Sequence, residues 1–83
     1  MTWRSDWAPE ADDDLRQVPW QDAASIVREV NLLVDDGVGD VRVIVLPNGA
    51  RARVLYLPGY RVSVTHDRAT RTVHVWGVWR VRP

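Results

Sequence analysis

The hydrophobic period of this chain changes at Val41, and this change limits the folds that the chain can adopt. Before Val41, apolar residues recur at the spacing of amphipathic helices. From Val41 onward, apolar and polar residues alternate, as they do in strands with one buried face. The chain has 83 residues, a length that suits one domain with one compact core. The sequence therefore predicts a single α+β domain over residues 1–83, with its helices before most of its strands.

Prolines and a glycine mark the ends of two expected helices. Pro9 suits the first turn of a helix, and Pro19 can both end that helix and start the next one. Gly37 is placed to end the second helix. The expected apolar stripes are Ala11, Leu15 and Val18 in the first helix, and Trp20, Ala23, Ala24, Val27, Val30 and Val34 in the second. Before both helices, the segment from Trp3 to Trp7 alternates like a short strand.

Turn residues divide the second half of the chain into strands. Pro47-Asn48-Gly49 is a strong hairpin signal, because Asn-Gly tolerates positive φ, and Pro58-Gly59 predicts a second turn. A polar stretch over residues 67–71 predicts a third turn. The expected strands are Val41 to Leu46, Ala50 to Leu57, Tyr60 to His66 and Thr72 to Val81. We therefore expect a strand, two antiparallel helices and three or four antiparallel strands.

Charge is divided between the two halves of the chain. Residues 1–40 hold ten acids and three arginines (3 − 10 = −7), whereas residues 41–83 hold eight arginines and one acid (8 − 1 = +7). The zero net charge of the whole chain hides this division. Because long-range fields follow local charge density, the basic half suggests a polyanion or an acidic partner.

Several classes of function are disfavoured by what the sequence lacks. The chain has no cysteine, so it has neither a disulfide framework nor a thiolate zinc site. It has no glycine-rich loop for a nucleotide phosphate, and its two histidines do not have the spacing of metal ligands. No apolar run approaches the length of a membrane span, and the N-terminus does not read as a secretory signal. We expect a cytoplasmic protein with no cofactor, no metal and no membrane contact.

Strand alternation predicts a basic face on the sheet. If the helices cover the valine side, six arginines converge on the open side: Arg42, Arg51, Arg53, Arg61, Arg80 and Arg82. A bulge at Gly77 would instead move the last two to the opposite face. Acids are expected to be absent from the open face, which favours an anion site over the alternative of a merely solvated sheet surface. Tyr60, His74 and Trp76 could stack on bases there. The other four tryptophans are expected to pack in the core: Trp3, Trp7, Trp20 and Trp79.

Several segments, in this order and spacing, resemble the RelE/ParE superfamily of type II toxin–antitoxin toxins over nearly the whole chain. The matching segments are Trp7-Ala8-Pro9-Glu10-Ala11, Asp14-Leu15, Val18-Pro19, the helix to Leu33, Leu57-Pro58-Gly59-Tyr60-Arg61-Val62 and Val73-His74-Val75-Trp76-Gly77-Val78. Gly59-Tyr60-Arg61 is the clearest, being similar to the family's Gly-Tyr-Arg at the start of its central strand. The resemblance implies two N-terminal helices packed on a curved antiparallel sheet of about four strands, in the order β-α-α-β-β-β, with an extra hairpin strand as an option.

The resemblance also implies partners and site residues. RelE-type members cleave mRNA on the ribosome, the ParE branch poisons DNA gyrase, and both are neutralised by a cognate antitoxin. In the RelE type, Arg61 and either Arg80 or Arg82 would contact the scissile phosphate. Arg51 or Arg53 would supply the basic residues of the preceding strand. Preplaced guanidiniums suit this chemistry, because attack by a ribose 2′-hydroxyl builds negative charge on the phosphorane.

Departures from the family pattern leave three functions open. RelE-type nucleases usually carry a Tyr, often with a His, in or after the last strand, whereas this chain closes on Trp79-Arg80-Val81-Arg82-Pro83. His74 is the nearby imidazole with a pKa range suited to proton transfer. The first function is a ribosome-dependent mRNA endonuclease, and the second is a non-catalytic gyrase inhibitor. The third is an inactive interaction module, which could form a homodimer by pairing acidic helices with the basic face of another copy.

Overall fold

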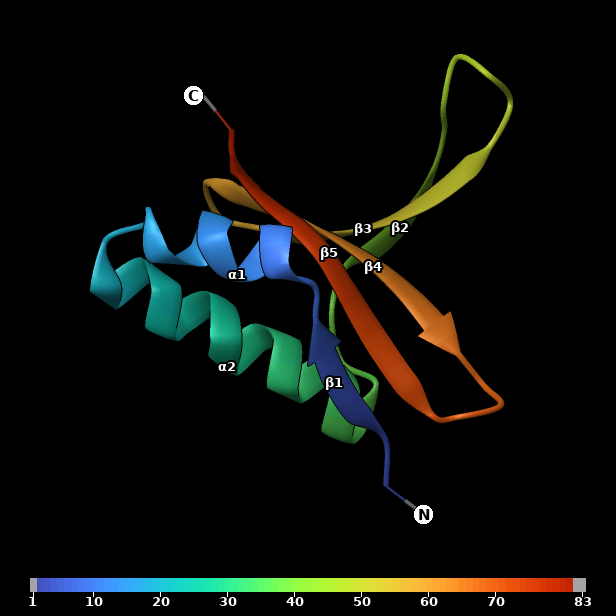
Figure 1. The fold of residues 1–83 in the computed structure, drawn as a ribbon, viewed down its shortest axis with the longest axis horizontal. Helices are drawn as coiled ribbons and strands as arrows, with labels where there is room; N and C mark the ends of the chain where they lie inside the picture. Colours follow the sequence, from blue (N-terminus) through green and yellow to red (C-terminus); the bar gives the residue numbers. More distant parts are fainter. Residues whose placement is uncertain (1, 82–83) are drawn as a thin grey trace.

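The computed structural model describes residues 2–81, which form two helices and five strands in an α+β fold (Figure 1). The elements are β1 (Arg4–Trp7), α1 (Pro9–Arg16), α2 (Trp20–Asp36), β2 (Val41–Val45), β3 (Arg51–Leu57), β4 (Tyr60–Asp67) and β5 (Thr72–Arg80). The α+β fold class predicted from the sequence is confirmed, with the expected turns between its elements. Neither helix of this described region is long and apolar enough to cross a membrane.

The sheet includes the N-terminal strand as a full member. Its strands lie in the order β1-β5-β4-β3-β2, and β1 pairs in parallel with β5, with Arg4 beside Thr72 and Trp7 beside Val75. The other pairs are antiparallel. The expected antiparallel sheet is present, and β1 is added to it in parallel. This pairing joins segments about seventy residues apart in the chain, so no local turn signal marks it.

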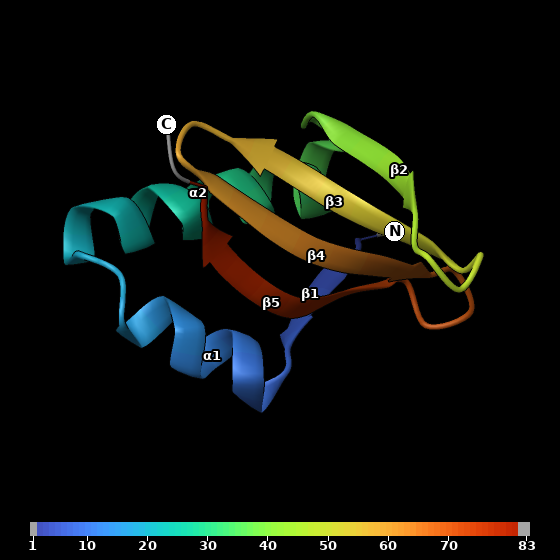
Figure 2. The same cartoon turned by 90° about the horizontal axis from the view of Figure 1, so that it is seen from above.

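The two helices cover one face of the sheet, and the core lies between these layers (Figure 2). From the helices, the core takes Ala11, Ile26, Val30, Leu33 and Val34; from the strands, it takes Leu55, Leu57, Tyr60, Val62, Val64, Val73, Val75 and Val78. Helix α2 ends at Gly37, whose φ of 67° is the left-handed conformation typical of a glycine after a helix.

The buried stripe of α2 differs from the expected one. Ile26, Val30 and Leu33 lie four and three residues apart and face the sheet, whereas Trp20 is 75% exposed. The expectation of a core role is therefore wrong for Trp20. Trp3 and Trp7 do pack against the core, as expected.

A bulge in β5 changes which residues face the helices. Ser63 pairs with Gly77 and Val64 pairs with Val75, so Trp76 has no partner of its own in β4. Beyond the bulge, Val78 is buried in the core and Trp79 is 45% exposed. The bulge considered at Gly77 is thus present, and the expectation that Trp79 packs in the core is wrong.

Candidate nucleic-acid interface

The face of the sheet opposite the helices carries aromatic and charged side chains. By strand register, this open face includes Arg4, Asp6, Arg42, Ile44, Ala52, Val54, Tyr56, Arg61, Ser63, Thr65, His74, Trp76 and Trp79. Trp76 is 49% exposed and Trp79 is 45% exposed. Exposed indole rings on a sheet are suitable platforms for stacking nucleic-acid bases.

Arg61 is held in place at one end of the open face. Its Nη1 donates hydrogen bonds to the carbonyl oxygens of Leu57 (2.9 Å) and Tyr60 (2.8 Å). Its guanidinium carbon lies 4.1 Å from the centroid of the Tyr56 ring. A guanidinium has five N–H donors, so these contacts leave the Nε and Nη2 donors of Arg61 for a ligand. This is the fork that binds a phosphate through two parallel hydrogen bonds.

Arg42 lies on the same aromatic ring, but a carboxylate compensates its charge. Its guanidinium carbon is 4.1 Å from the centroid of the Tyr56 ring. Arg42 donates from Nε to Asp40 Oδ1 (3.1 Å) and from Nη2 to Asp40 Oδ2 (2.9 Å). The hydrogen bonds from Arg42 lower the pKa of Asp40, so both members of the pair are charged at neutral pH. The expectation of a face without acids is therefore wrong.

His74 lies further along the open face, in an ordered aromatic cluster. Its Nδ1 is 3.4 Å from Asp6 Oδ2, and its ring stacks on Trp76 with centroids 5.6 Å apart and planes inclined by 26°. Trp76 Nε1 donates to Thr65 Oγ1 (2.8 Å). Asp6 and Trp76 together fix the orientation of the imidazole. No group of His, Asp or Glu side chains within residues 2–81 is arranged to hold a metal ion.

Arg61 and His74 lie too far apart to act on one phosphate. His74 pairs with Thr65, and Arg61 precedes Thr65 by four residues in β4. At about 3.3 Å per strand residue, the two groups are separated by about 13 Å along the sheet. They can therefore contact different nucleotides of one strand, but they do not form a single catalytic pair.

Arg51 and Arg53 lie on the helix-covered face, not on the open face. Leu55 and Leu57 are buried in the core and share the parity of these arginines in β3. The hairpin of β2 and β3 projects past the helices, so both arginines remain exposed (Figure 1). The expectation that Arg51 and Arg53 lie on the open face is therefore wrong, because Leu55 and Leu57, which share their side of β3, fill the core.

A basic end forms where the β2–β3 and β4–β5 turns meet. Arg53 Nη1 lies 3.4 Å from His66 Nδ1, and the Trp3 ring meets the His66 ring edge-on at 5.8 Å between centroids. Burial is the largest cause that lowers the pKa of His66, followed by the charges of Arg53 and Arg68. Asp67 accepts hydrogen bonds from the turn amides of Ala69 (3.0 Å) and Thr70 (3.3 Å). We name Arg51, Arg53, His66 and Arg68 the basic end.

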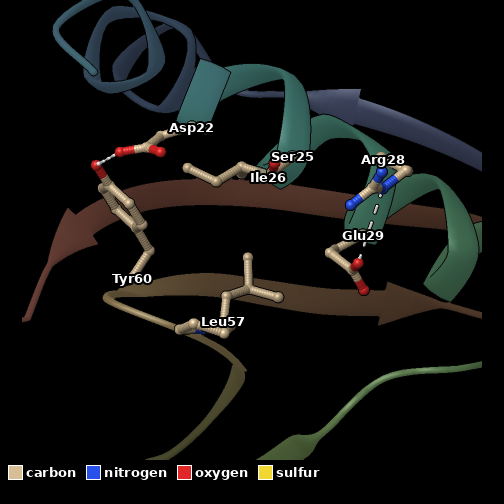
Figure 3. Close-up of a pocket in the computed structure, with 8 residues that line it drawn as sticks. Asp22, Ser25, Ile26, Arg28, Glu29, Leu57 and Tyr60 are labelled. Carbon is tan, nitrogen blue, oxygen red and sulfur yellow. Dashed lines mark hydrogen bonds and ion pairs between the residues drawn. The ribbon is translucent and has the colours of Figure 1, made fainter. Parts of the chain in front are cut away.

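Tyr60 and Arg80 pair across β4 and β5 on the helix-covered face. Tyr60 is 7% exposed, which does not suit the base-stacking role expected of it. Its hydroxyl donates to Asp22 Oδ2 (2.7 Å) in α2, and it borders a groove of about 290 Å³ whose other lining residues include Ile26 and Leu57 (Figure 3). The bulge therefore moves Arg80 away from Arg61, and Arg82 lies outside the described residues.

The predicted arginine face is thus divided into separate regions. Arg42, Arg61, His74 and Trp76 share the open face, Arg51 and Arg53 belong to the basic end, and Arg80 lies near the helices. The alternation of apolar and polar residues in the sequence did not indicate four members of the open face: Asp6, Asp40, Tyr56 and Trp79. The position of Asp40 immediately before β2 was the one local signal for its pairing with Arg42.

The arrangement of helices and strands is that of solved RelE-type structures. No protein-family model matches the chain, and no curated protein matches it. A chain of the toxin–antitoxin complex RelBE2 from Mycobacterium tuberculosis superposes with a TM-score of 0.82 at 16% identity, over 98% of this chain and 100% of that one. A chain of the archaeal RelE–RelB complex from Pyrococcus horikoshii gives 0.77 at 15% identity, over 96% of each chain.

A third structure extends the comparison to the full length of both chains. A chain of the intact RelBE toxin–antitoxin complex of E. coli gives a TM-score of 0.58 at 15% identity, over 100% of each chain. At these identities the likeness concerns the fold. The protein therefore has a RelE-like fold over essentially its entire length.

Proposed function

We propose that this protein is the toxin of a type II toxin–antitoxin pair and that a cognate antitoxin neutralises it. Two independent features support the proposal. The fold agrees over 98% of the chain with a chain of a RelBE2 complex. In addition, Gly59-Tyr60-Arg61 lies at the start of β4, which begins at Tyr60, and the family resemblance expects Gly-Tyr-Arg at this point.

The proposed target is mRNA on the ribosome, and Arg61 is the central site residue. Arg61 is a cation of the open face that neutral groups fix in place, namely two carbonyl oxygens and the ring of Tyr56. Its remaining donors can stabilise the charge that builds on the phosphorane when a 2′-hydroxyl attacks. This arrangement of Arg61 is the observation that carries the proposal.

In this proposal, Tyr56 of β3 supplies the phenol that RelE-type nucleases usually carry on a tyrosine in or after their last strand. It adjoins Arg61 on the open face and is the tyrosine of that face within residues 2–81. A phenol can transfer a proton in a general acid–base step. His74 and Trp76, about 13 Å from Arg61 along the sheet, would then bind a neighbouring nucleotide by stacking.

Arg80 and the basic end take supporting roles in this proposal. Arg51, Arg53 and Arg68 would contact ribosomal RNA phosphates outside the cleavage site, because their position is remote from Arg61. Contacts of this kind add affinity that falls as the salt concentration rises. Arg80, on the helix-covered face, would contact the antitoxin or the ribosome instead of the scissile phosphate.

A non-catalytic inhibitor of DNA gyrase is the second candidate. The separation of His74 from Arg61 and the neutralisation of Arg42 by Asp40 favour it, because a blocking surface needs no acid–base pair. A gyrase supercoiling assay with the purified protein separates the two candidates. Inhibition of supercoiling together with intact mRNA would select the gyrase function.

Growth of bacteria that express the chain tests the toxin proposal. We expect growth arrest, which co-expression of the antitoxin relieves and which Arg61→Ala abolishes. Arg16→Ala is the matched control, because Arg16 is an exposed arginine on α1 that pairs with Asp12. Normal growth at high expression of folded protein would contradict a toxin function, and unaltered toxicity of Arg61→Ala would contradict the site.

A further inference from the structure

Strand β2 is the edge of the sheet and presents exposed apolar side chains. Val43 is 56% exposed and Val45 is 70% exposed. Within residues 2–81, no strand lies beyond β2 in the sheet. Edge strands are commonly protected from pairing by proline, a bulge or charged side chains. The segment Val41–Val45 has no proline and no bulge, and Asp40 compensates the charge of its one charged residue, Arg42.

Two hydrogen bonds establish which backbone groups of β2 point outward. The Tyr56 amide donates to the Asp40 carbonyl (2.8 Å), and the Leu46 amide donates to the Ala50 carbonyl (2.8 Å). In an antiparallel pair, residues that bond to the neighbour alternate with residues that point their N–H and C=O groups to the other side. Even-numbered residues of β2 therefore bond to β3. The free donors and acceptors belong to Val41, Val43 and Val45.

We propose that this edge pairs with the same edge of a second copy, antiparallel, about a two-fold axis at Val43. Val43 then lies opposite Val43 of the second copy, and Val41 lies opposite its Val45. The contacts on the helix-covered face are apolar, and on the open face Arg42 meets Ile44. No two like charges lie directly opposite each other, which a self-paired strand requires for stability.

Charge complementarity favours a second copy over other occupants. Val45 is the register partner of Arg51, so one end of β2 lies beside the arginines of β3. The other end follows the exposed Asp35 and Asp36 at the end of α2. Antiparallel pairing brings Arg51 and Arg53 of each copy toward Asp35 and Asp36 of the other copy. The two-fold symmetry produces this approach at both ends of the paired strands. This interface is independent of the proposed toxin function.

The oligomeric state of the purified full chain tests the interface. We expect sedimentation or light scattering to show a monomer–dimer equilibrium that depends on protein concentration. Val43→Lys should weaken the dimer by about tenfold or more, because it places two ammonium groups opposite each other. Val38→Lys is the matched control, since Val38 and Val43 are each 56% exposed and Val38 lies outside the strand. The control should change the dissociation constant by less than about twofold.

Single-cysteine variants test the register, because the natural chain has no cysteine. Oxidised Val43→Cys should form a covalent dimer, whereas Val45→Cys should not, since its two copies would lie about 13 Å apart, beyond disulfide reach. A monomer at all concentrations would overturn the proposal, as would a dimer indifferent to Val43→Lys or equal cross-linking of the two cysteine variants. Protection of the outward β2 amides only after addition of the antitoxin would instead assign the edge to the antitoxin.

Discussion

Asp14 of α1 accepts a hydrogen bond from the backbone amide of Val78, with Oδ2 and N 3.0 Å apart. Val78 follows the bulge of β5, beyond the last residue that pairs with β1. The Ala8 amide binds the Val75 carbonyl (2.9 Å) on the same side of the strand. Beyond the end of β1, the Ala8 amide and the Asp14 carboxylate therefore continue the hydrogen bonding along this edge of β5.

Asp14→Ala should destabilise the protein. It leaves the Val78 amide without its partner, so we expect the free energy of unfolding to fall by about 1–3 kcal/mol. Asp14→Asn is the matched control, because its amide oxygen can accept the same bond, and it should recover most of the loss. Urea unfolding followed by tryptophan fluorescence measures both variants. Equal stability of the alanine variant and the natural chain would exclude this role of Asp14.

The pKa of His66 should lie below its ordinary value of about 6.5. Burial is the main cause, and the charges of Arg53 and Arg68 add to it. Because the folded state disfavours the imidazolium, this group stabilises the fold above pH 6.5 and loses that contribution as the pH falls through its folded pKa. A titration by NMR should show a lowered pKa that rises in Arg53→Gln. Arg51→Gln is the control, and an equal rise in it would contradict the specific role of Arg53.

The local signals of the chain were sufficient for its elements. Pro9, Pro19 and Gly37 bound the helices, and the Asn48-Gly49 turn forms the hairpin, because each acts through the backbone of a few neighbouring residues. The parallel pairing of β1 with β5 could not be predicted in this way, since it joins segments about seventy residues apart in the chain.

The site was less predictable than the fold, because both faces of β3 include apolar residues. Ala52, Val54 and Tyr56 alternate with Leu55 and Leu57, so alternation alone does not decide which set faces the helices. The choice depends on how well each set fills the space beneath α2. The register beyond the bulge in β5 likewise depends on Asp14, which lies 64 positions from Val78 in the sequence.

The stability conferred by Tyr60 should disappear at alkaline pH. Its hydrogen bond to Asp22 is the main cause that raises the pKa of Tyr60, and burial adds to it. The neutral phenol is therefore favoured in the folded state. Its contribution is complete below the ordinary tyrosine pKa of about 10 and is lost as the pH rises through the folded pKa.

Tyr60→Phe tests this pH dependence. The variant should be less stable than the natural chain at pH 7, and the difference should shrink as the pH rises above 10. Tyr56→Phe is the matched control, because it removes a phenol hydroxyl of the open face that has no hydrogen bond to Asp22. The midpoints of urea unfolding, measured between pH 7 and pH 11, test this prediction. A constant difference in stability between Tyr60→Phe and the natural chain over this range would contradict it.

The ring and the hydroxyl of Tyr56 should have separable roles. The ring lies between the guanidiniums of Arg42 and Arg61, whereas the hydroxyl is the proposed acid–base group. Tyr56→Phe should keep the protein folded with Arg61 in place but reduce the rate of cleavage by about 10²-fold or more. Tyr56→Ala should also weaken RNA binding. Single-turnover cleavage on stalled ribosomes measures the rate, and full activity of the phenylalanine variant would remove the hydroxyl from the mechanism.

Primer extension on an mRNA in a reconstituted translation system, with the natural chain and with Arg61→Ala, tests the central claim most directly. The account predicts discrete cuts that require ribosomes, appear with the natural chain and are absent with Arg61→Ala. Cuts that persist in Arg61→Ala would contradict the assigned site. An intact message in excess of folded natural protein would contradict the proposed nuclease.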